Sequence, residues 1–435
     1  MRVALAVALV CAAPAFAQGA SDLSSPFSLT RPREGDGPAS AYLRLRDAEA
    51  AYRGSTDWWS NYAQNRAGAA ARLGLHAEAL RYYDASSGAG PDSVGVLPPG
   101  TRAVDAVDYL AAAADTARVI IVNEAHHDAA SRLLTLRLLP VLYERGFRYF
   151  AAETFAPDSV LAAQPPYPTA AMGHFVGEPV FGQVVREALR LGYTLVPYEI
   201  EDADEATADT ALSRQQLRDM TQARHLAERT VVRDPEARVL VHAGFGHVYE
   251  GADEYWYPMA LYFRERTGID PLTVDQVEMS ERSELAFEHP RYRAAVDAGL
   301  VGEASVVLVD PAGAPLAPVG GALVDLQAVR PRTVYRGGRP TWMRLGGRSY
   351  RESVDLPAVC AAVLCVVEAR ELGEPRDALP PGAGPSDAVP LDRVLAEGAG
   401  PVMLFRPRSA WIKTVRDGQT GATLLHVFVG SFRID

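Results

Sequence analysis

Two short apolar runs in the middle of the chain each lead into a cluster of histidines. Residues 119–122 precede Asn123-Glu124-Ala125-His126-His127, and residues 239–241 precede His242-Ala243-Gly244-Phe245-Gly246-His247. Apolar runs of this length, followed by polar residues and then a helical pattern, are typical of buried parallel strands that open into loops. Ligands of open α/β sheets bind at the carboxyl ends of such strands. Four of the nine histidines therefore fall where this fold would hold an active site.

Carboxylates also follow the predicted strands. Glu124 comes shortly after the first run, Glu153 ends the apolar residues 150–152, and Glu199 follows Tyr198. An unpaired buried charge at Glu153 would cost several kcal/mol, so we expect it to pair with a histidine or with Arg218. Glu199 begins an acidic run that is equally consistent with a solvated loop.

This set of groups supports two chemistries. Neutral imidazoles with a carboxylate can hold a divalent transition metal and leave one position open for water. The ligands in that case would be Glu124, His126, His242 and His247. Alternatively, a histidine whose other ring nitrogen is fixed by a glutamate deprotonates water directly, without a metal. His126 and His127 point apart because they are neighbours, and the sequence leaves open which of them is the base.

Structural roles compete with these functional ones. Glu124 would be favourable near the start of the next helix, His242 could be a hydrogen-bonded core residue, and His247 could belong to a turn. We favour the functional interpretation, because two adjacent histidines and a glutamate exceed what a helix cap requires. His174 and Glu178 lie in a Pro-rich insertion, residues 157–179, that could cover the site, although we favour an ordinary surface loop there.

Strand and helix patterns alternate in the central part of the chain. The alternation predicts an α/β fold with a mainly parallel sheet flanked by helices. We expect strands at residues 118–123, 148–152, 194–198, 238–242 and 272–277, and helices at 129–145, 181–191, 212–233 and 256–267.

Composition divides the chain into five regions. Residues 69–84 resemble one helix pair of a tetratricopeptide repeat, but a single copy indicates only a small helical unit. Short apolar runs separated by Gly and Pro turns predict a β-rich C-terminal region. In order, we expect a signal peptide at 1–17, a linker at 18–38, a helical subdomain at 39–95, the α/β core with the His/Glu site at 96–300, and the β-rich region at 301–435.

The first residues have the order of a secretory signal peptide. Arg2 precedes an apolar stretch over residues 3–13, and Ala15-Phe16-Ala17 forms an A-x-A cleavage site. The apolar stretch is too short for a permanent membrane helix, and no other stretch approaches ~20 apolar residues. We therefore expect cleavage after Ala17, a periplasmic or secreted protein, and no integral membrane segment after cleavage.

The net charge of the chain indicates which class of ligand it binds. A net charge of −11 argues against nucleic-acid binding, which requires a basic surface, so we expect a small-molecule substrate. Signal cleavage would remove Cys11 and leave Cys360 and Cys365. An oxidising compartment permits a disulfide between these two if a turn separates them, while two buried apolar thiols are an equal alternative.

At these motifs the chain resembles a superfamily that includes erythromycin esterases, bacterial haem-binding uptake lipoproteins and Tiki-type proteases. That family opens with Gly-Glu-x-His or Gly-Glu-x-x-His after its first strand, and its second strand ends in a glutamate. A helix beginning Arg-Asp-x-x-Met-Ala-x-Asn and a Gly-x-Gly-His or Asn-x-His turn follow. The matching segments here are Asn123 to His127, Phe150 to Glu153, Arg218 to His225 and His242 to Val248.

The resemblance covers residues 115–280 and departs from the pattern in places. Asn123 replaces the usual glycine, and Gln222 and His225 replace Met and Asn of the third motif. Nothing in the chain is diagnostic of macrolide binding. The resemblance therefore implies a site without a substrate.

The first expected function is an exported hydrolase in which water attacks an ester, lactone or amide. His126 or His127 would be the base, oriented by Glu124 or Glu153. His247 would be a second acid/base, and Arg218 would stabilise the oxyanion. No Gly-x-Ser-x-Gly sequence occurs, which argues against a serine nucleophile of that type.

The second expected function is ligand binding without turnover. The same cleft would hold haem or a metal ion, with His126 or His247 as the ligand. A third alternative, a degenerate scaffold that serves a partner, follows from the replacement at Asn123.

Overall fold

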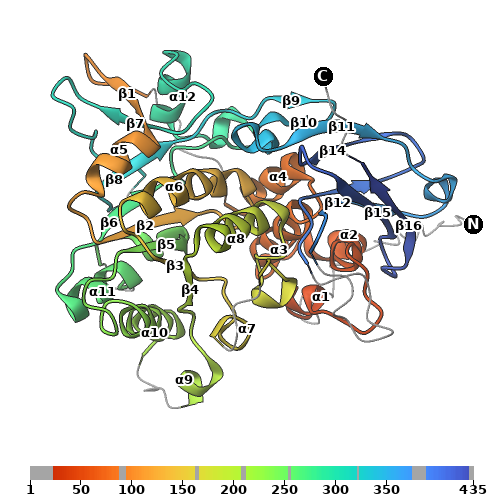
Figure 1. Cartoon of the computed structure of the whole chain (residues 1–435), viewed down its shortest axis with the longest axis horizontal. Coiled ribbons are helices and arrows are strands. Elements are labelled where there is room, and N and C mark those ends of the chain that lie inside the picture. The colour runs from red at the N-terminus through yellow and green to blue at the C-terminus, as the bar shows by residue number, and fades with distance from the viewer. Residues whose placement is uncertain are drawn as a thin grey trace, which may run out of the picture.

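The computed structural model describes residues 23–87, 95–161, 166–206, 212–252, 256–320, 323–374 and 388–430. The expected signal peptide at residues 1–17, with Cys11 and the cleavage site, lies outside the described residues. Figure 1 shows a central sheet with helices on both faces, a second sheet built from the end of the chain, and the first helices between them.

The central sheet has eight strands in the order β1-β7-β8-β6-β2-β5-β3-β4. Neighbouring strands from β8 to β4 are parallel, which confirms the predicted α/β fold with a mainly parallel sheet. The five strands expected from the sequence are β2 (Val119–Glu124), β3 (Tyr149–Ala152), β4 (Thr194–Pro197), β5 (Val239–Gly244) and β6 (Leu272–Asp275).

One edge of this sheet is antiparallel and was not expected. β1 (Arg102–Asp105) pairs with β7 (Val306–Val309), which pairs with β8 (Leu326–Val329). The core sheet therefore extends beyond residue 300, where the sequence analysis placed its end. The apolar run that forms β7 gives no sign in the sequence of which sheet it joins, because strand pairing is a long-range interaction.

Helices cover both faces of the sheet. On one face α5 (Ala106–Ala113), α6 (Arg132–Glu144) and α8 (Pro179–Leu191) pack against alternate residues of β2, such as Ile120 and Val122. On the other face α10 (Arg214–Arg229) and α11 (Met259–Thr267) pack against Val119 and Ile121. Burial on both faces explains why β2 reads as a continuous apolar run.

The N-terminal helices form one unit against the second sheet. They are α1 (Phe27–Thr30), α2 (Ser40–Tyr52), α3 (Trp59–Ala71) and α4 (His76–Ser87), of which α1 lies in the segment expected to be a linker. Tyr42, Ala70 and Leu73 from this unit pack against Val366 and Leu395 of the second sheet. The N-terminal helices are therefore anchored on the C-terminal region, as Figure 1 shows at its right side.

The C-terminal region is β-rich, as predicted. Its four-stranded antiparallel sheet runs β13-β12-β15-β16, and smaller pairs form between β11 and β14 and between β9 and β10. Cys360 and Cys365 form a disulfide with Cα atoms 5.6 Å apart, across a short 3₁₀ turn. The strands are β9 (Tyr335–Arg336), β10 (Arg339–Pro340), β11 (Tyr350–Val354), β12 (Cys365–Glu371), β13 (Asp392–Ala396), β14 (Val402–Arg406), β15 (Trp411–Asp417) and β16 (Thr423–Val429).

Shorter helices complete the described structure. None of the helices in the described ranges has the length and apolar character needed to span a lipid bilayer. The α-helices among them are α7 (Pro157–Leu161), α9 (Asp202–Ala206) and α12 (Pro290–Asp297), and the 3₁₀ helices are η1 (Ala129–Ser131), η2 (Ala170–Met172), η3 (Phe245–Val248), η4 (Leu285–Phe287), η5 (Thr341–Gly347) and η6 (Ala358–Ala361).

Candidate functional site

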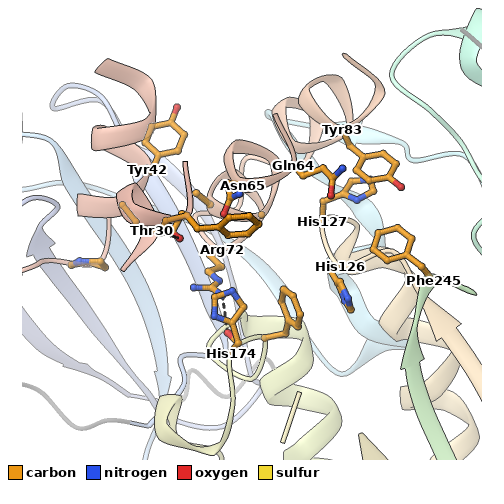
Figure 2. Close-up of a pocket in the computed structure, with 16 residues that line it drawn as sticks. Thr30, Tyr42, Gln64, Asn65, Arg72, Tyr83, His126, His127, His174 and Phe245 are labelled. Atoms are coloured by element: carbon orange, nitrogen blue, oxygen red, sulfur yellow. Dashed lines mark hydrogen bonds between the residues drawn. The ribbon is translucent and has the colours of Figure 1, made fainter. Parts of the chain in front are cut away.

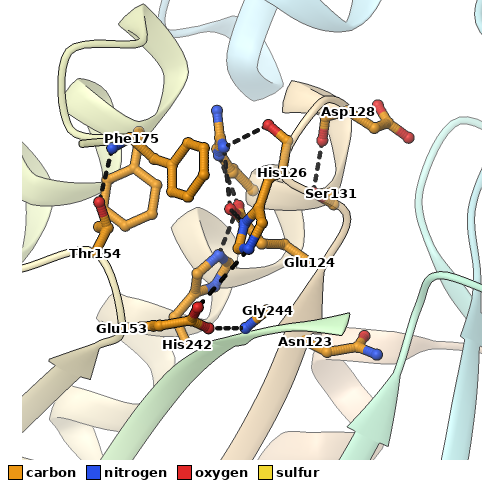
Figure 3. A network of polar contacts seen from close by, with 12 residues as sticks. Asn123, Glu124, His126, Asp128, Ser131, Glu153, Thr154, Phe175, His242 and Gly244 are labelled. Atoms are coloured by element: carbon orange, nitrogen blue, oxygen red, sulfur yellow. Dashed lines mark hydrogen bonds and ion pairs between the residues drawn. The ribbon is translucent and has the colours of Figure 1, made fainter. Parts of the chain in front are cut away.

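Glu124, the last residue of β2, is the centre of a buried polar network (Figure 3). Its Oε1 accepts hydrogen bonds from His126 Nδ1 at 2.8 Å and Arg132 Nη2 at 3.0 Å. Its Oε2 accepts from Arg132 Nε at 2.7 Å and His242 Nε2 at 2.9 Å. Four donors on one carboxylate satisfy its acceptor capacity, so Glu124 orients its neighbours and has no lone pair left for a substrate proton.

Arg132 supplies the charge that keeps Glu124 ionised. Burial of Glu124 favours the neutral acid, but Arg132 and His242 outweigh it and hold the pKa of Glu124 well below its usual range. Arg132 is fully buried at the start of α6, and its Nη1 also donates to Glu178 Oε2 at 2.7 Å. This guanidinium, paired with two carboxylates, ties the loop after β2 to the start of α8.

His126 is held by Glu124 on one side and faces Glu153 on the other. Its Nδ1 bonds Glu124, and its Nε2 lies 3.8 Å from Glu153 Oε1. The ring stacks on Phe175 at 4.1 Å and meets the edge of Phe245 at 5.0 Å. With a side chain 24% exposed, His126 has a fixed orientation and an Nε2 lone pair free of Glu124.

Arg218 joins Glu153 to two further groups. Its Nη2 donates to Glu153 Oε1 at 2.5 Å, and its Nε and Nη2 donate to the two oxygens of Glu199 at 2.9 and 2.5 Å. Burial of Glu153 raises its pKa, but His247, His126 and Arg218 outweigh burial and lower the pKa of Glu153 to about 2. The expected pairing of Glu153 with Arg218 is present, and Glu199 belongs to the same cluster.

His247 lies between Asp219 and Arg218. Its Nδ1 is 2.5 Å from Asp219 Oδ1, and its Nε2 accepts from Arg218 Nη1 at 2.9 Å. This arrangement requires a neutral ring with hydrogen on Nδ1. Burial lowers the pKa of His247, but Glu153 and Asp219 outweigh burial and raise the pKa overall.

Gly244 permits the close approach of His126 and Glu153. A Cβ at Gly244 would lie 2.5 Å from Nε2 of His126 and 2.7 Å from Oε2 of Glu153, and the Gly244 N–H donates to that same Oε2 at 2.5 Å. The next residue, Phe245, has a φ of 43°, which is unfavourable for a residue with a side chain. Its carbonyl accepts from Asn123 Nδ2 at 2.8 Å, so Asn123 holds the strained turn that carries Gly244.

His127 and His242 make different contacts from those of His126. His127 is buried, stacks on Tyr83 at 3.7 Å, and has its pKa lowered to about 3 by burial. His242 is also buried, with Nε2 on Glu124 and Nδ1 accepting from Thr135 Oγ1 at 2.9 Å. His127 therefore packs beside the network, whereas His242 fixes Glu124.

A cavity of about 270 Å³ opens beside His126 (Figure 2). It lies between the N-terminal helices and the carboxyl edge of the sheet, and His127, Phe175 and Phe245 share its wall with His126. His174 also lines it, so the insertion at residues 157–179 contributes to the site, in contrast to the surface loop that we expected. The N-terminal helices contribute Arg72 and Tyr83 to the same cavity.

The predicted metal ligands do not fit a metal ion in this arrangement. Both oxygens of Glu124 are hydrogen-bonded, and both ring nitrogens of His242 and of His247 have protein partners. In the described part of the chain, no three His, Cys, Asp or Glu side chains are grouped so that they could hold a metal ion. His247 contacts Arg218 and Asp219, whereas His126 and His242 contact Glu124, so the four predicted ligands are divided between two clusters.

The volume of the cavity argues against haem as its ligand. At about 270 Å³ it lies just below the ~300–1,000 Å³ range of common small-molecule sites, and a tetrapyrrole requires more room. His126 is the predicted haem ligand that lines the cavity, whereas His247 is absent from the described lining.

The structure brings together most of the predicted site residues and adds two that the sequence reasoning missed. Glu124, His126 and His242 form one cluster, and Glu153, Arg218 and His247 form the next. The missed residues are Arg132, for which the sequence gives no signal, and Asp219, whose place in the Arg218-Asp219 pair of the third motif could have indicated it.

Comparisons with known proteins give no family. No family model matches the chain, and no curated protein matches it. One solved structure, described as "Bacterial protein toxins", aligns at 14% identity with a TM-score of 0.29 over 61% of this chain and 58% of its own length. This chain therefore spans less than two thirds of that protein, and at such a TM-score the likeness indicates neither a shared fold nor a shared function.

Proposed function

We propose that the protein is an exported hydrolase in which His126 activates water for attack on an ester, lactone or amide carbonyl. The observation that carries the proposal is the placement of His126. Its Nδ1 is fixed by the paired carboxylate of Glu124, its Nε2 faces Glu153 at 3.8 Å, and its ring lines the cavity. A neutral imidazole held in one tautomer by a carboxylate is the arrangement that a general base requires.

The water would be held by two acceptors. The Nε2 lone pair of His126 and Oε1 of Glu153 are close enough for one water molecule to donate a hydrogen bond to each. On attack, one water proton moves to His126 Nε2 and the oxygen bonds to the carbonyl carbon. When the tetrahedral intermediate collapses, the bond to the leaving oxygen or nitrogen breaks and His126 returns the proton to the leaving group. The net reaction is hydrolysis, with no other reactant.

Arg218 and His247 keep the second acceptor charged and in place. Four of the five N–H groups of Arg218 bond Glu153, Glu199 and His247, and the fifth is a candidate donor to the developing oxyanion. Asp219 orients His247 through Nδ1. In this proposal His247 acts through Arg218, as a positioning residue.

Export is part of the proposal and has one structural support. The bond between Cys360 and Cys365 fits an oxidising compartment, where such bonds persist. The apolar stretch near the start of the sequence, with an A-x-A site ending at Ala17, is the proposed signal for export.

The test is turnover by the purified full chain of a panel of p-nitrophenyl esters, aliphatic lactones and aryl amides, with and without EDTA. We expect turnover that survives EDTA and falls by about 10²–10⁴-fold in His126→Gln, the range for loss of a general base. His426→Gln, at an exposed position on β16 of the second sheet, is the matched control and should stay within about threefold of the wild type. Turnover lost to EDTA, or lost equally in both variants, would contradict the assignment, and a Soret band on adding haem without turnover would favour ligand binding.

A further inference from the structure

Arg72, which is half-buried, differs from Arg132 and Arg218 in its partners. It follows α3, and its guanidinium points into the cavity from the side opposite Phe245 (Figure 2). Its Nη2 donates to the backbone oxygen of His174 at 2.8 Å, and the described residues provide it with no ion pair. By contrast, Arg132 and Arg218 each pair with two carboxylates.

The unpaired charge persists at neutral pH. Burial lowers the pKa of Arg72 to about 10, the nearby Arg393 and Arg132 act in the same direction, and Glu178 opposes them without forming an ion pair with Arg72. The group therefore stays cationic in an environment that disfavours its charge. An anionic ligand would offset that cost, and a guanidinium presents the fork that binds a carboxylate through two parallel hydrogen bonds.

The cavity has a polar end and an aromatic end. Thr30 and Asn65 lie on the Arg72 side of the cavity (Figure 2), whereas Phe175 and Phe245 contact His126 and Tyr83 stacks on His127. Two of the three histidines that line the cavity, His127 and His174, are neutral at pH 7, since burial lowers the pKa of each to about 3. Among the described lining residues, Arg72 is the only arginine or lysine, so the cavity balances one negative charge.

We propose that the cavity binds a small mono-anionic molecule by its carboxylate, with Arg72 holding the carboxylate and an apolar or aromatic body lying toward His126. The inference rests on the proposed function for one step only. If His126 is the base, the substrate is a small ester or amide that carries a free carboxylate at the end remote from the scissile bond. A phosphate dianion fits less well, because a single guanidinium faces it.

The test measures binding without turnover, by calorimetry on the full chain with 3-phenylpropionate and its neutral isostere 3-phenylpropanamide. We expect the wild type to prefer the carboxylate by at least about tenfold, the scale of a charge-assisted hydrogen bond. Arg72→Gln should lose that preference while binding the amide as the wild type does, and Arg72→Lys should keep part of it. Arg81→Gln, an exposed arginine on α4, is the matched control and should behave as the wild type.

Three outcomes would overturn the inference. They are equal binding of acid and amide by the wild type, an unchanged preference in Arg72→Gln, or tighter Arg72-dependent binding of phenylphosphonate than of the carboxylate. Failure here is separable from failure of the proposed function. A carboxylate preference that needs Arg72, in a protein that hydrolyses nothing, would reject only the hydrolase. Ester turnover that needs His126, with no such preference, would reject only the carboxylate site.

Discussion

Nδ1 of His247 lies 2.5 Å from Oδ1 of Asp219, a carboxylate with no solvent exposure. Asp219 also accepts from Met259 N at 3.0 Å and from Trp256 Nε1 at 2.9 Å. The pair therefore fixes the tautomer of His247 and ties α10 to the turn after β5. The same contact presents Nε2 of His247 to Arg218.

Replacing Asp219 tests this relationship. In Asp219→Asn the amide cannot accept from all of these donors, so we expect about 1–3 kcal/mol lower unfolding free energy. His247 would lose its orientation, and kcat/KM for the best ester of the panel should fall roughly 10²-fold with a shifted pH profile. Urea unfolding and a pH series of kcat/KM measure both effects. Asp297→Asn, at an exposed position on α12, should change neither, and an unaltered pH profile in Asp219→Asn would reject the positioning role.

Glu124 should be essential for stability as well as for turnover. Glu124→Gln removes the charge that faces the fully buried Arg132, and breaking such a buried pair costs about 3–5 kcal/mol. We expect that loss in urea unfolding, reduced to the extent that Glu178 still compensates Arg132. Glu228→Gln removes two exposed pairs, with Arg224 and Arg266, and should cost about 1 kcal/mol or less. Equal costs for the two variants would mean that the network around Glu124 contributes little.

Adding one methyl group at Gly244 should reduce turnover by displacing His126 and Glu153. Gly244→Ala places a Cβ 2.5 Å from the His126 ring and 2.7 Å from Glu153, so the two groups must move apart. A displacement of about 1 Å at a reacting group can cost about 10²-fold in rate, and we expect at least that loss of ester turnover. Gly302→Ala, where a Cβ meets nothing within 4 Å, is the matched control. Wild-type turnover in Gly244→Ala would show that the spacing of His126 and Glu153 is unimportant.

Acid should destabilise the protein through Glu153. Burial opposes its charge, yet His247, His126 and Arg218 lower the pKa of Glu153 to about 2, from its ordinary value of 4.5. A group with a depressed folded pKa contributes stability that is present above the unfolded pKa and is lost as pH falls toward the folded pKa.

The matched variant for this effect is Glu153→Gln. Between pH 5 and pH 2 the wild type should lose on the order of 3 kcal/mol more unfolding free energy than the variant, because only the wild type must protonate this carboxylate. Denaturant unfolding at closely spaced pH values measures the difference. Parallel stability curves for the two proteins would contradict the assigned ionisation.

The fold class and the edge of the sheet that carries the candidate site follow from the sequence alone. Periodicity and apolar runs report local burial, and residues such as Ile120 and Leu240 are buried on whichever neighbour packs against them, so β2 and β5 could be predicted with their helices. Parallel strands in one sheet bring their carboxyl ends to one edge. Glu124, His126 and His242 were therefore expected to meet there.

Which groups contact one another at that edge depends on the folded chain. His126 and His127 are chemically identical neighbours, and they differ because one side chain reaches Glu124 whereas the other stacks on Tyr83 from a distant helix. The ion pairs of Arg132, the place of β7 in the core sheet and the unpaired charge of Arg72 over the cavity likewise depend on contacts between residues far apart in the chain. Such contacts are set by long-range packing and hydrogen-bond register, which leave no periodic trace in the sequence.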